Sequence, residues 1–218
     1  MKRNVLGVFK AVLIALVVLA GGIALPILFR PFFWWHIEPL DLPKITGLSI
    51  RQIQTAYGEM MDYCIGHSKN FSAGVLPFSE AGASHFADVR KLFLLDLGVL
   101  VISAALLIGL AILGRKQPLR LGGHIPGFWA AVGLGASFVT IAALAAIDFN
   151  RAFTVFHKLF FPGKDNWLFD GRTDPIIYML PAEFFRNCAI LILGAILASC
   201  LGLLLWDRKY IHHSLQKR

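Results

Sequence analysis

Four long apolar runs constrain this chain more than any other feature of its sequence. They occupy residues 5–29, 93–113, 125–147 and 184–206. Each run has the roughly 20 apolar residues that an α-helix needs to cross a hydrocarbon layer about 30 Å thick. Because an isolated segment in lipid must satisfy its own backbone hydrogen bonds, such runs can span only as helices. We therefore expect an all-α integral membrane protein whose residues 1–218 form a single membrane domain.

The composition supports a membrane protein over a soluble one. Hydrophobic residues make up 57% of the chain and charged residues only 16%, and the mean hydropathy is +0.67. A soluble domain of this length is far more polar. The first run follows two basic residues, as in a secretory signal, but it is longer than the usual apolar core of about 7–15 residues. We expect it to remain as an uncleaved first helix.

The distribution of basic residues predicts the orientation. Ten of them lie near the termini or between the second and third runs, where Asp207 is the only acidic residue: Lys2, Arg3, Lys10, Arg115, Lys116, Arg120, Arg208, Lys209, Lys217 and Arg218. By the positive-inside rule, both termini are cytoplasmic and residues 30–92 and 148–183 are extracellular loops. The net charge of +8 therefore reflects topology, and we expect no nucleic-acid partner.

The first extracellular loop contains the pattern of an amphipathic helix. Ser49 and Gln52 form a capping-box pair. Apolar residues then recur every three or four positions over residues 50–65, which indicates a helix lying in the interface or covering the bundle as an extracellular cap. Ser84 is a candidate N-cap for the second membrane helix. Asp174 is a candidate N-cap for a short turn beginning at Pro175.

Two histidines are expected at one depth outside the membrane. His85 lies eight residues before the run at 93, and His157 lies nine residues after Asp148, where the third run has ended. With a rise of about 1.5 Å per residue, straight helices would place both about 12–14 Å beyond the hydrocarbon boundary. Asp88, three residues after His85, is placed to hold its ring, and Asp148 is placed to pair with Arg151 beneath His157.

Spacing alone leaves other interpretations of these residues open. They could be ordinary interfacial histidines, or His85, His157 and His67 could ligate zinc with a carboxylate. No HxxxH or HExxH spacing supports zinc, and we expect no metal and no cofactor. Cys64 and His67 could form a nucleophilic dyad, but Cys64 falls on the apolar stripe of its helix, where a buried thiol is the commoner outcome. Asp96, just inside the second run, is a weaker candidate.

Three sequence blocks carry a resemblance to a known family. They are SHFADVRKLF around His85, FHKLFF around His157, and KDNWLFDGRTDPIIYMLPAEFF. With four apolar runs and a large first external loop, they resemble the lipoprotein intramolecular transacylase family, Lit, of Gram-positive bacteria. The resemblance implies a multi-pass acyltransferase of the bacterial cell membrane with its active site at the extracellular face. It also implies a diacylglyceryl lipoprotein substrate, whose glycerol sn-2 acyl chain moves to the α-amino group of the N-terminal cysteine to give the lyso form.

The resemblance assigns the catalytic roles to His85 and His157, one as base and the other as acid or oxyanion donor. We expect His157 to be the base, because its aromatic surroundings favour the neutral imidazole. Further residues are expected to bind substrate or support the site, the aromatic ones by gripping acyl chains of substrate or membrane lipid: Asp88, Asp148, Arg151, Phe153, Phe156, Lys158, Phe160, Phe161, Asn166, Trp167 and Arg172. The helix over residues 50–65 would exclude water as a lid. The alternative is a non-catalytic lipid-binding or transport-associated envelope protein.

Overall fold

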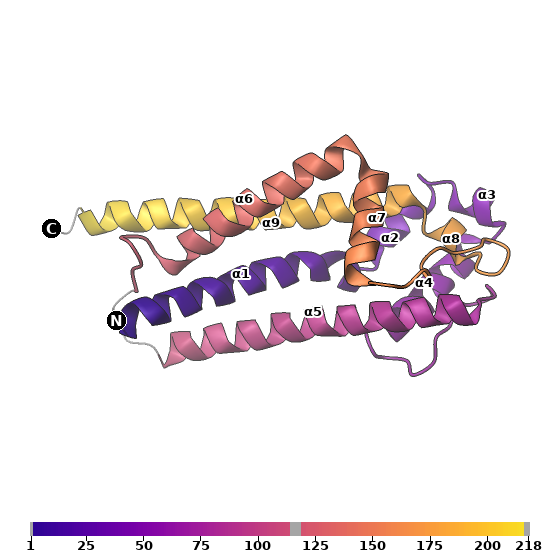
Figure 1. Cartoon of the computed structure of the whole chain (residues 1–218), viewed down its shortest axis with the longest axis horizontal. Helices are drawn as coiled ribbons and strands as arrows, with labels where there is room; N and C mark the ends of the chain where they lie inside the picture. Colours follow the sequence, from indigo (N-terminus) through magenta and orange to yellow (C-terminus); the bar gives the residue numbers. More distant parts are fainter. Residues whose placement is uncertain (1, 114–118, 216–218) are drawn as a thin grey trace. The chain divides into compact units, whose positions relative to one another are not determined.

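The computed structural model describes residues 2–113 and 119–215, and within these ranges the chain is helical with no β-strand (Figure 1). An isolated bridge pairs Leu121 with His124. The helices are α1 (Lys2–Leu28), α2 (Pro31–Ile37), α3 (Leu42–Thr46), α4 (Ile50–Cys64), α5 (Glu80–Ile112), α6 (Pro126–Ile147), α7 (Phe149–Phe160), α8 (Ile176–Met179) and α9 (Ala182–Leu215). Part of the charge pattern used for orientation lies outside the described residues, namely Arg115, Lys116, Lys217 and Arg218, and so does the side chain of Lys2.

Four of these helices are long and apolar enough to cross a membrane. They include Arg3–Leu28, Glu80–Ile112, Pro126–Ile147 and Ala182–His212. Many of their large apolar side chains are exposed, which is the arrangement expected of helices whose solvent is lipid. The prediction of an all-α protein with four membrane-length helices is confirmed.

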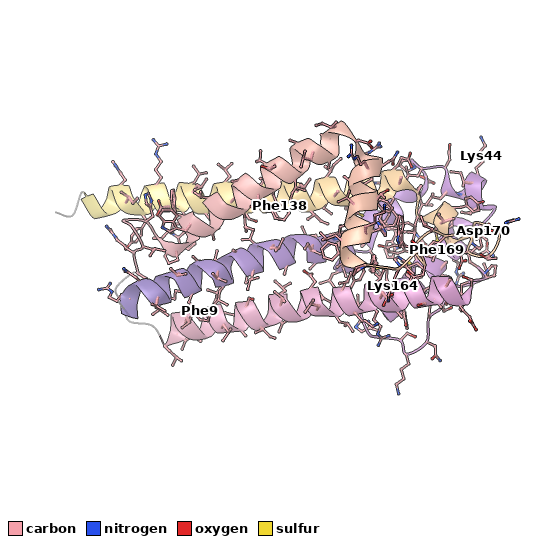
Figure 2. All side chains as sticks on the ribbon, in the orientation of Figure 1. Phe9, Lys44, Phe138, Lys164, Phe169 and Asp170 are labelled. Carbon is pink, nitrogen blue, oxygen red and sulfur yellow. The ribbon has the colours of Figure 1, made fainter. Side chains whose placement is uncertain are left out.

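The helices contribute to two compact units. The first unit consists of Met1–Ile23, Leu97–Leu144 and Leu191–Arg218. Its core contains Ala131, Ile196 and Cys200, packed by partly buried residues that include Phe138 (Figure 2). Gly22 permits close helix packing here, because a Cβ at this position would lie 2.8 Å from Ile196 Cγ1. Small residues at such crossings are typical of membrane helices.

The second unit consists of Ala24–Asp96 and Ala145–Ile190 and is organised around α4. The predicted capping box is present: the Ser49 side chain accepts from Gln52 N, and the Gln52 side chain accepts from Ser49 N. The apolar face of α4 is buried. Tyr57 on this face stacks on Phe33 of α2 with ring centroids 3.8 Å apart, and Phe184 at the start of α9 meets Phe33 edge-on at 5.1 Å. These contacts make α4 part of the core of this unit.

Two helix starts differ from the sequence predictions. Helix α5 begins at Glu80, about one turn before the predicted start. Ser79 provides the cap, since its Oγ accepts from Gly82 N at 3.0 Å. The carboxylate of Asp174 does not cap α8, whose N-cap is Pro175. Instead it accepts from Ser79 N at 2.8 Å and from Thr173 Oγ1 at 2.7 Å, and so fixes the segment before α8 to the start of α5.

The predicted depth of His157 assumed that the third membrane helix runs straight past Asp148, and that assumption is also wrong. Helix α6 ends at Ile147, and α7 is a separate helix that begins at Phe149. Asp148 between them has φ −152° and ψ 96°, which is not helical, and its side chain accepts from Arg151 N at 3.0 Å. Asp148 therefore acts as the N-cap of α7.

Candidate active site

His157 is held on the buried side of α7. This helix is amphipathic: Val155, Leu159 and Phe160 are exposed, whereas the His157 side turns into the second unit and leaves the residue only 9% exposed. The helix ends at Phe160, just before Pro162, which cannot donate a backbone hydrogen bond. One short helix thus presents hydrocarbon on one side and an imidazole on the other.

The hydrogen bond of His157 defines its tautomer. Its Nδ1 lies 2.9 Å from the carbonyl oxygen of Phe153. A carbonyl only accepts hydrogen bonds, so Nδ1 carries the proton and donates it. In the neutral ring the lone pair is then on Nε2. Burial lowers the pKa of His157 below its ordinary value, and the bond to Phe153 opposes that shift without cancelling it. The side chain is therefore a neutral imidazole with a basic Nε2.

His85 lies in the second turn of α5 and is 6% exposed. Its Nδ1 is buried, and among the described residues no hydrogen-bond partner is within reach. Buried polar atoms are normally paired, because leaving one unpaired costs about 1–3 kcal/mol. An unpaired imidazole nitrogen in a buried position is a candidate for interaction with a ligand.

The two imidazoles lie together. Their ring centroids are 6.0 Å apart and their planes are inclined by 29°. Phe161 contacts both rings, at 4.9 Å from His85 and 5.7 Å from His157. Two positive charges at this separation would repel strongly in an apolar environment. The pair therefore favours at most one proton beyond the neutral state.

Aromatic rings enclose the histidines from several segments. Phe153 and Trp167 lie 4.1 Å and 4.7 Å from the His157 ring, and Phe169 lies 5.5 Å from the His85 ring. Phe169 is labelled in Figure 2 and was missed by the sequence interpretation. Its position in the polar segment after Pro162, two residues beyond Trp167, was the available signal.

A network of polar side chains holds the segment after α7 against α5. The Asp88 carboxylate accepts from Lys91 Nζ at 3.1 Å and from Lys164 Nζ at 2.5 Å. The Asn166 amide nitrogen lies 3.4 Å from the same carboxylate and 3.4 Å from Ser84 Oγ. No hydrogen bond from Asp88 to the His85 ring occurs among the described residues, so the expected support of that ring is replaced by a link to Lys164. Asn166 Oδ1 is buried and, within the same residues, has no partner.

The other candidates divide into those near the histidines and those away from them. Phe156 lies 5.6 Å from the His157 ring and 4.6 Å from Phe160. Lys158 is on the exposed side of α7. Arg172 pairs with Asp170 at 2.7 Å on an exposed turn. Arg151 contributes its backbone N–H to the Asp148 cap, and no ion pair between those two side chains is present in the described part of the chain.

The cysteine interpretation loses its physical basis in this structure. Cys64 is 1% exposed, and burial raises the pKa of its thiol to about 12. A thiol that stays protonated at neutral pH is a poor nucleophile. His67 is exposed, and its Nδ1 lies 3.5 Å from Asp62. Among the residues that the structure describes, no group of three or more His, Cys, Asp or Glu side chains is arranged to hold a metal ion.

Comparison with known proteins adds an independent line of evidence. The fold matches the crystal structure of the membrane-integral lipoprotein intramolecular transacylase Lit from Bacillus cereus with a TM-score of 0.88 and 23% identity, over 100% of this chain and 99% of that chain. Two variants of the Bacillus cereus protein, in which a histidine is replaced by arginine or by alanine, match with TM-scores of 0.79 and 0.78, at 22% identity in each case. They cover 100% of this chain and 95% and 96% of those chains. No curated protein sequence gives a significant match.

The sequence itself matches a family model described as lipoprotein intramolecular transacylase Lit over residues 8–185. This range includes all three sequence blocks and ends in the first turn of α9, which begins at Ala182. The chain belongs to the lipoprotein intramolecular transacylase (Lit) family, whose members are acyltransferases of the membrane.

Proposed function

We propose that this protein moves the sn-2 acyl chain of a diacylglyceryl lipoprotein to the α-amino group of its N-terminal cysteine, and that His85 and His157 perform the transfer. Membership of the family supports the reaction class. The observation that carries the assignment of residues is the buried imidazole pair, 6.0 Å between ring centroids within an aromatic enclosure.

His157 acts as the base. A free α-amino group has a pKa of about 7.7–8.0, so much of it is protonated at neutral pH. The ammonium form first loses a proton to solvent, since only the neutral amine has a lone pair. As the neutral nitrogen attacks the ester carbonyl carbon, the Nε2 lone pair of His157, fixed by the bond from Nδ1 to the Phe153 carbonyl, takes a second proton from it. The bond from the carbonyl carbon to the glycerol oxygen then breaks. The imidazolium of His157 returns its proton to that oxygen, which leaves a glycerol hydroxyl and a neutral ring.

His85 stabilises the tetrahedral intermediate. As a neutral imidazole in an apolar enclosure it has one N–H to donate, and the carbonyl oxygen gains negative charge during attack. A donor already in place for that charge is worth several kcal/mol in comparable enzymes, typically about 3–4. This role suits a ring beside His157, because His85 stays neutral while His157 carries the extra proton, so the two rings are never charged together.

The remaining side chains hold the substrate. The attack closes a ring of about eight atoms, so fixing the folded substrate supplies part of the rate. We assign this role to the aromatic residues around the histidines, and assign to Asn166 Oδ1 a hydrogen bond from the α-amino group. The aromatic enclosure also excludes water that would hydrolyse the ester. The apolar face of α4 packs on α2 and α9, so we assign α4 to the support of this unit rather than to a moving lid.

The orientation follows from the basic residues. With ten Lys and Arg residues near the termini and the loop between α5 and α6, both termini are cytoplasmic and the second unit forms an extracellular cap. The acyl donor and the N-terminus of a mature lipoprotein would then meet the histidines at the outer face. Reporter fusions test this: a fluorescent protein that folds only in the cytoplasm should be bright at the C-terminus, and a dark fusion there would reverse the topology.

The activity is tested with purified protein and a synthetic diacylglyceryl lipopeptide. Mass spectrometry should detect an N-acyl, S-monoacylglyceryl product of unchanged mass and altered fragmentation. His85→Gln and His157→Gln should each lose activity by at least about 100-fold, the scale of a general base or an oxyanion donor. His67→Gln, a histidine of the same unit outside the pair, is the matched control and should keep activity. Full activity in either variant of the pair contradicts the assignment.

A further inference from the structure

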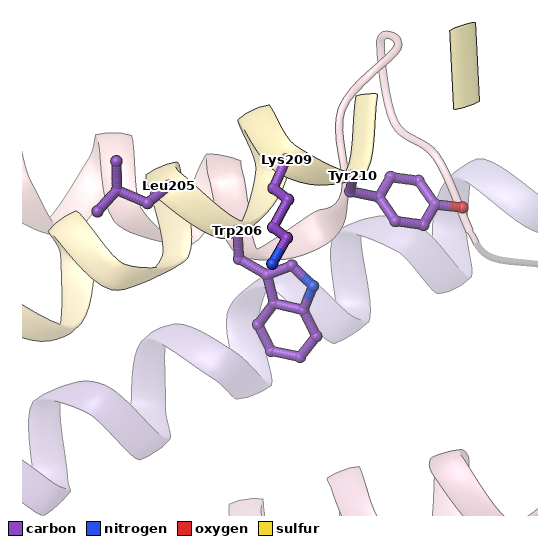
Figure 3. Close-up of a pocket in the computed structure, with 4 residues that line it drawn as sticks. All are labelled: Leu205, Trp206, Lys209 and Tyr210. Carbon is purple, nitrogen blue, oxygen red and sulfur yellow. The ribbon is translucent and has the colours of Figure 1, made fainter. Parts of the chain in front are cut away.

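The end of α9 in the first unit carries two adjoining open pockets of mixed chemistry, which are together called the cavity below. One part, of about 500 Å³, is lined by Leu205, Trp206, Lys209 and Tyr210. Figure 3 shows these four side chains along one helix, with Lys209 extending toward the Trp206 indole. A second part, of about 710 Å³, shares Leu205 and Lys209 with the first and adds Arg208 of α9 and Phe128 of α6. The cavity lies far along the sequence from the histidine pair and belongs to the other compact unit.

A buried carboxylate gives this cavity a fixed wall. Asp207 is 3% exposed, and its two oxygens accept from His124 Nδ1 at 2.7 Å and from Ile125 N at 2.9 Å. The His124 ring stacks on Phe128 with centroids 3.9 Å apart. Trp129 Nε1 donates to Leu121 O at 2.8 Å. These bonds fix residues 121–125 against α9, so the wall is a built structure.

The side chains that face outward here are cationic. Arg208 and Lys209 make no ion pair with an acidic side chain in the described part of the chain, and Asp207, which precedes them, is already engaged by His124. Arg120 places its guanidinium 5.5 Å from the Tyr210 ring centroid. The cavity therefore combines several cations with rings of Trp and Tyr, the residues that favour the headgroup level of a membrane.

Hydrocarbon-compatible surface leads directly into this cationic end. Leu201, Leu205 and Lys209 are four residues apart, so they lie in one row along α9. The two leucines are 58% and 57% exposed, within a helix that is apolar enough to span a membrane. A ligand that follows this row needs an acyl chain beside the leucines and an anion beside Lys209. Nucleic acids and acidic peptides offer the anion without the chain.

We propose that this cavity binds an anionic glycerophospholipid, with its phosphate between Arg208 and Lys209 and an acyl chain along Leu201 and Leu205. The Trp206 and Tyr210 rings border the glycerol region. Binding at this place is separate from the transacylase reaction and ties the end of α9 to the membrane surface. Clusters of basic residues next to a membrane helix attract anionic lipid by about 1 kcal/mol for each cation.

Native mass spectrometry of the full-length protein in detergent tests the proposal. The probes are phosphatidylglycerol and phosphatidylcholine with identical acyl chains, added in increasing amounts at fixed ionic strength. We expect the wild type to retain phosphatidylglycerol preferentially. Removing one cation, by Arg208→Ala or Lys209→Ala, should weaken phosphatidylglycerol binding about fivefold, and removing both should weaken it about 25-fold. The matched control, Lys44→Ala with Lys69→Ala, removes the same charge from exposed positions elsewhere and should leave binding unchanged.

Three outcomes overturn the proposal. Equal loss of binding in the control pair would mean that only net charge matters and that no site exists. Displacement of the lipid by millimolar inorganic phosphate, with sodium chloride at equal ionic strength as the reference, would mean a simple anion site without acyl-chain contact. Thermal unfolding provides a second measurement. Phosphatidylglycerol should raise the melting temperature of the wild type and leave that of the Arg208→Ala, Lys209→Ala double variant unchanged. Equal stabilisation of both proteins would also refute the assignment.

Discussion

The carboxylate of Asp88 offers the sharpest test of how the site is held together. It joins α5 to the segment after α7 through Lys164, whose Nζ lies 2.5 Å away. That segment also carries Trp167, which contacts the His157 ring, and Phe169, which contacts the His85 ring. Asp88→Asn keeps the size of the side chain and removes its charge. We expect the segment to loosen and the aromatic enclosure with it.

The magnitude follows from the exposure of the partners. A hydrogen bond to a charged group contributes about 1.5–3 kcal/mol when it is well shielded. The Asp88 side chain is 10% exposed, but Lys164 is 44% exposed and Lys91 is 76% exposed. The bond to Lys91 therefore contributes little, and the bond to Lys164 is partly screened by solvent. We expect Asp88→Asn to lower the free energy of unfolding by about 1–2 kcal/mol and to reduce kcat/KM about tenfold, equivalent to about 1.4 kcal/mol of barrier.

A double-mutant cycle with Lys164→Gln measures this link. The coupling between positions 88 and 164 should be about 1 kcal/mol or more in unfolding, and the two single variants should lose activity to a similar extent. The ion pair between Arg30 and Asp62, also 2.5 Å and in the same unit, provides the control. Asp62→Asn should lose stability without a comparable loss of activity. Coupling below about 0.5 kcal/mol, or equal loss of activity in the control, would refute the reasoning.

Three further predictions concern protonation and packing. An NMR titration should place the pKa of His157 below about 6.5, because burial disfavours the charged ring, and Trp167→Ala should raise that pKa by admitting water. Because the unfolded chain binds the proton more readily, the free energy of unfolding should fall as pH drops below the unfolded-state pKa of His157. An unshifted titration would contradict this. Asp207→Ala removes the acceptor of two hydrogen bonds at a 3% exposed position, so it should lower the free energy of unfolding by about 2–4 kcal/mol in a thermal melt. A loss below about 0.5 kcal/mol would show that these bonds do not hold residues 121–125 against α9. Gly82→Ala places a Cβ against Asp174 Oδ1, closer than two such atoms can approach. It should therefore lower the melting temperature by displacing that carboxylate, and an unchanged melting temperature would contradict the contact.

The sequence predicts those elements whose signal is local. Four apolar runs of sufficient length become four helices because length and hydropathy alone decide the matter. The capping box at Ser49 follows from the Ser49–Gln52 spacing, and the buried stripe of α4 follows from the 3.6-residue period; both occur as predicted. The start of α5 cannot be predicted from local sequence, because Ser79 and Ser84 are both good N-cap residues. Ser79 is selected by its backbone N–H bond to Asp174, a residue 95 positions away that no local pattern reveals.

The candidate site shows the same division between local and distant contacts. Depth along two helices brought His85 and His157 to one level, and their rings are indeed neighbours, although the third helix that was assumed to be continuous breaks at Asp148. At Asp148 the i+3 spacing to Arg151 fits either an ion pair or a cap. The break in the helix leaves the Arg151 N–H in need of an acceptor, so the cap forms.

Two acidic residues, Asp88 and Asp174, show in the same way that distant contacts override local spacing. The position of Asp88, three residues from His85, favoured a bond to the ring, and that of Asp174 favoured a cap on the following turn. Each carboxylate instead accepts from a donor more than 75 positions away along the chain. A nearly buried carboxylate must find donors, and a cation or a free backbone N–H satisfies it better than a neutral ring nitrogen. Sequence spacing therefore predicts that such a group is paired, while the fold decides its partner. By this argument the unpaired Nδ1 of His85 is the exception that most needs a function.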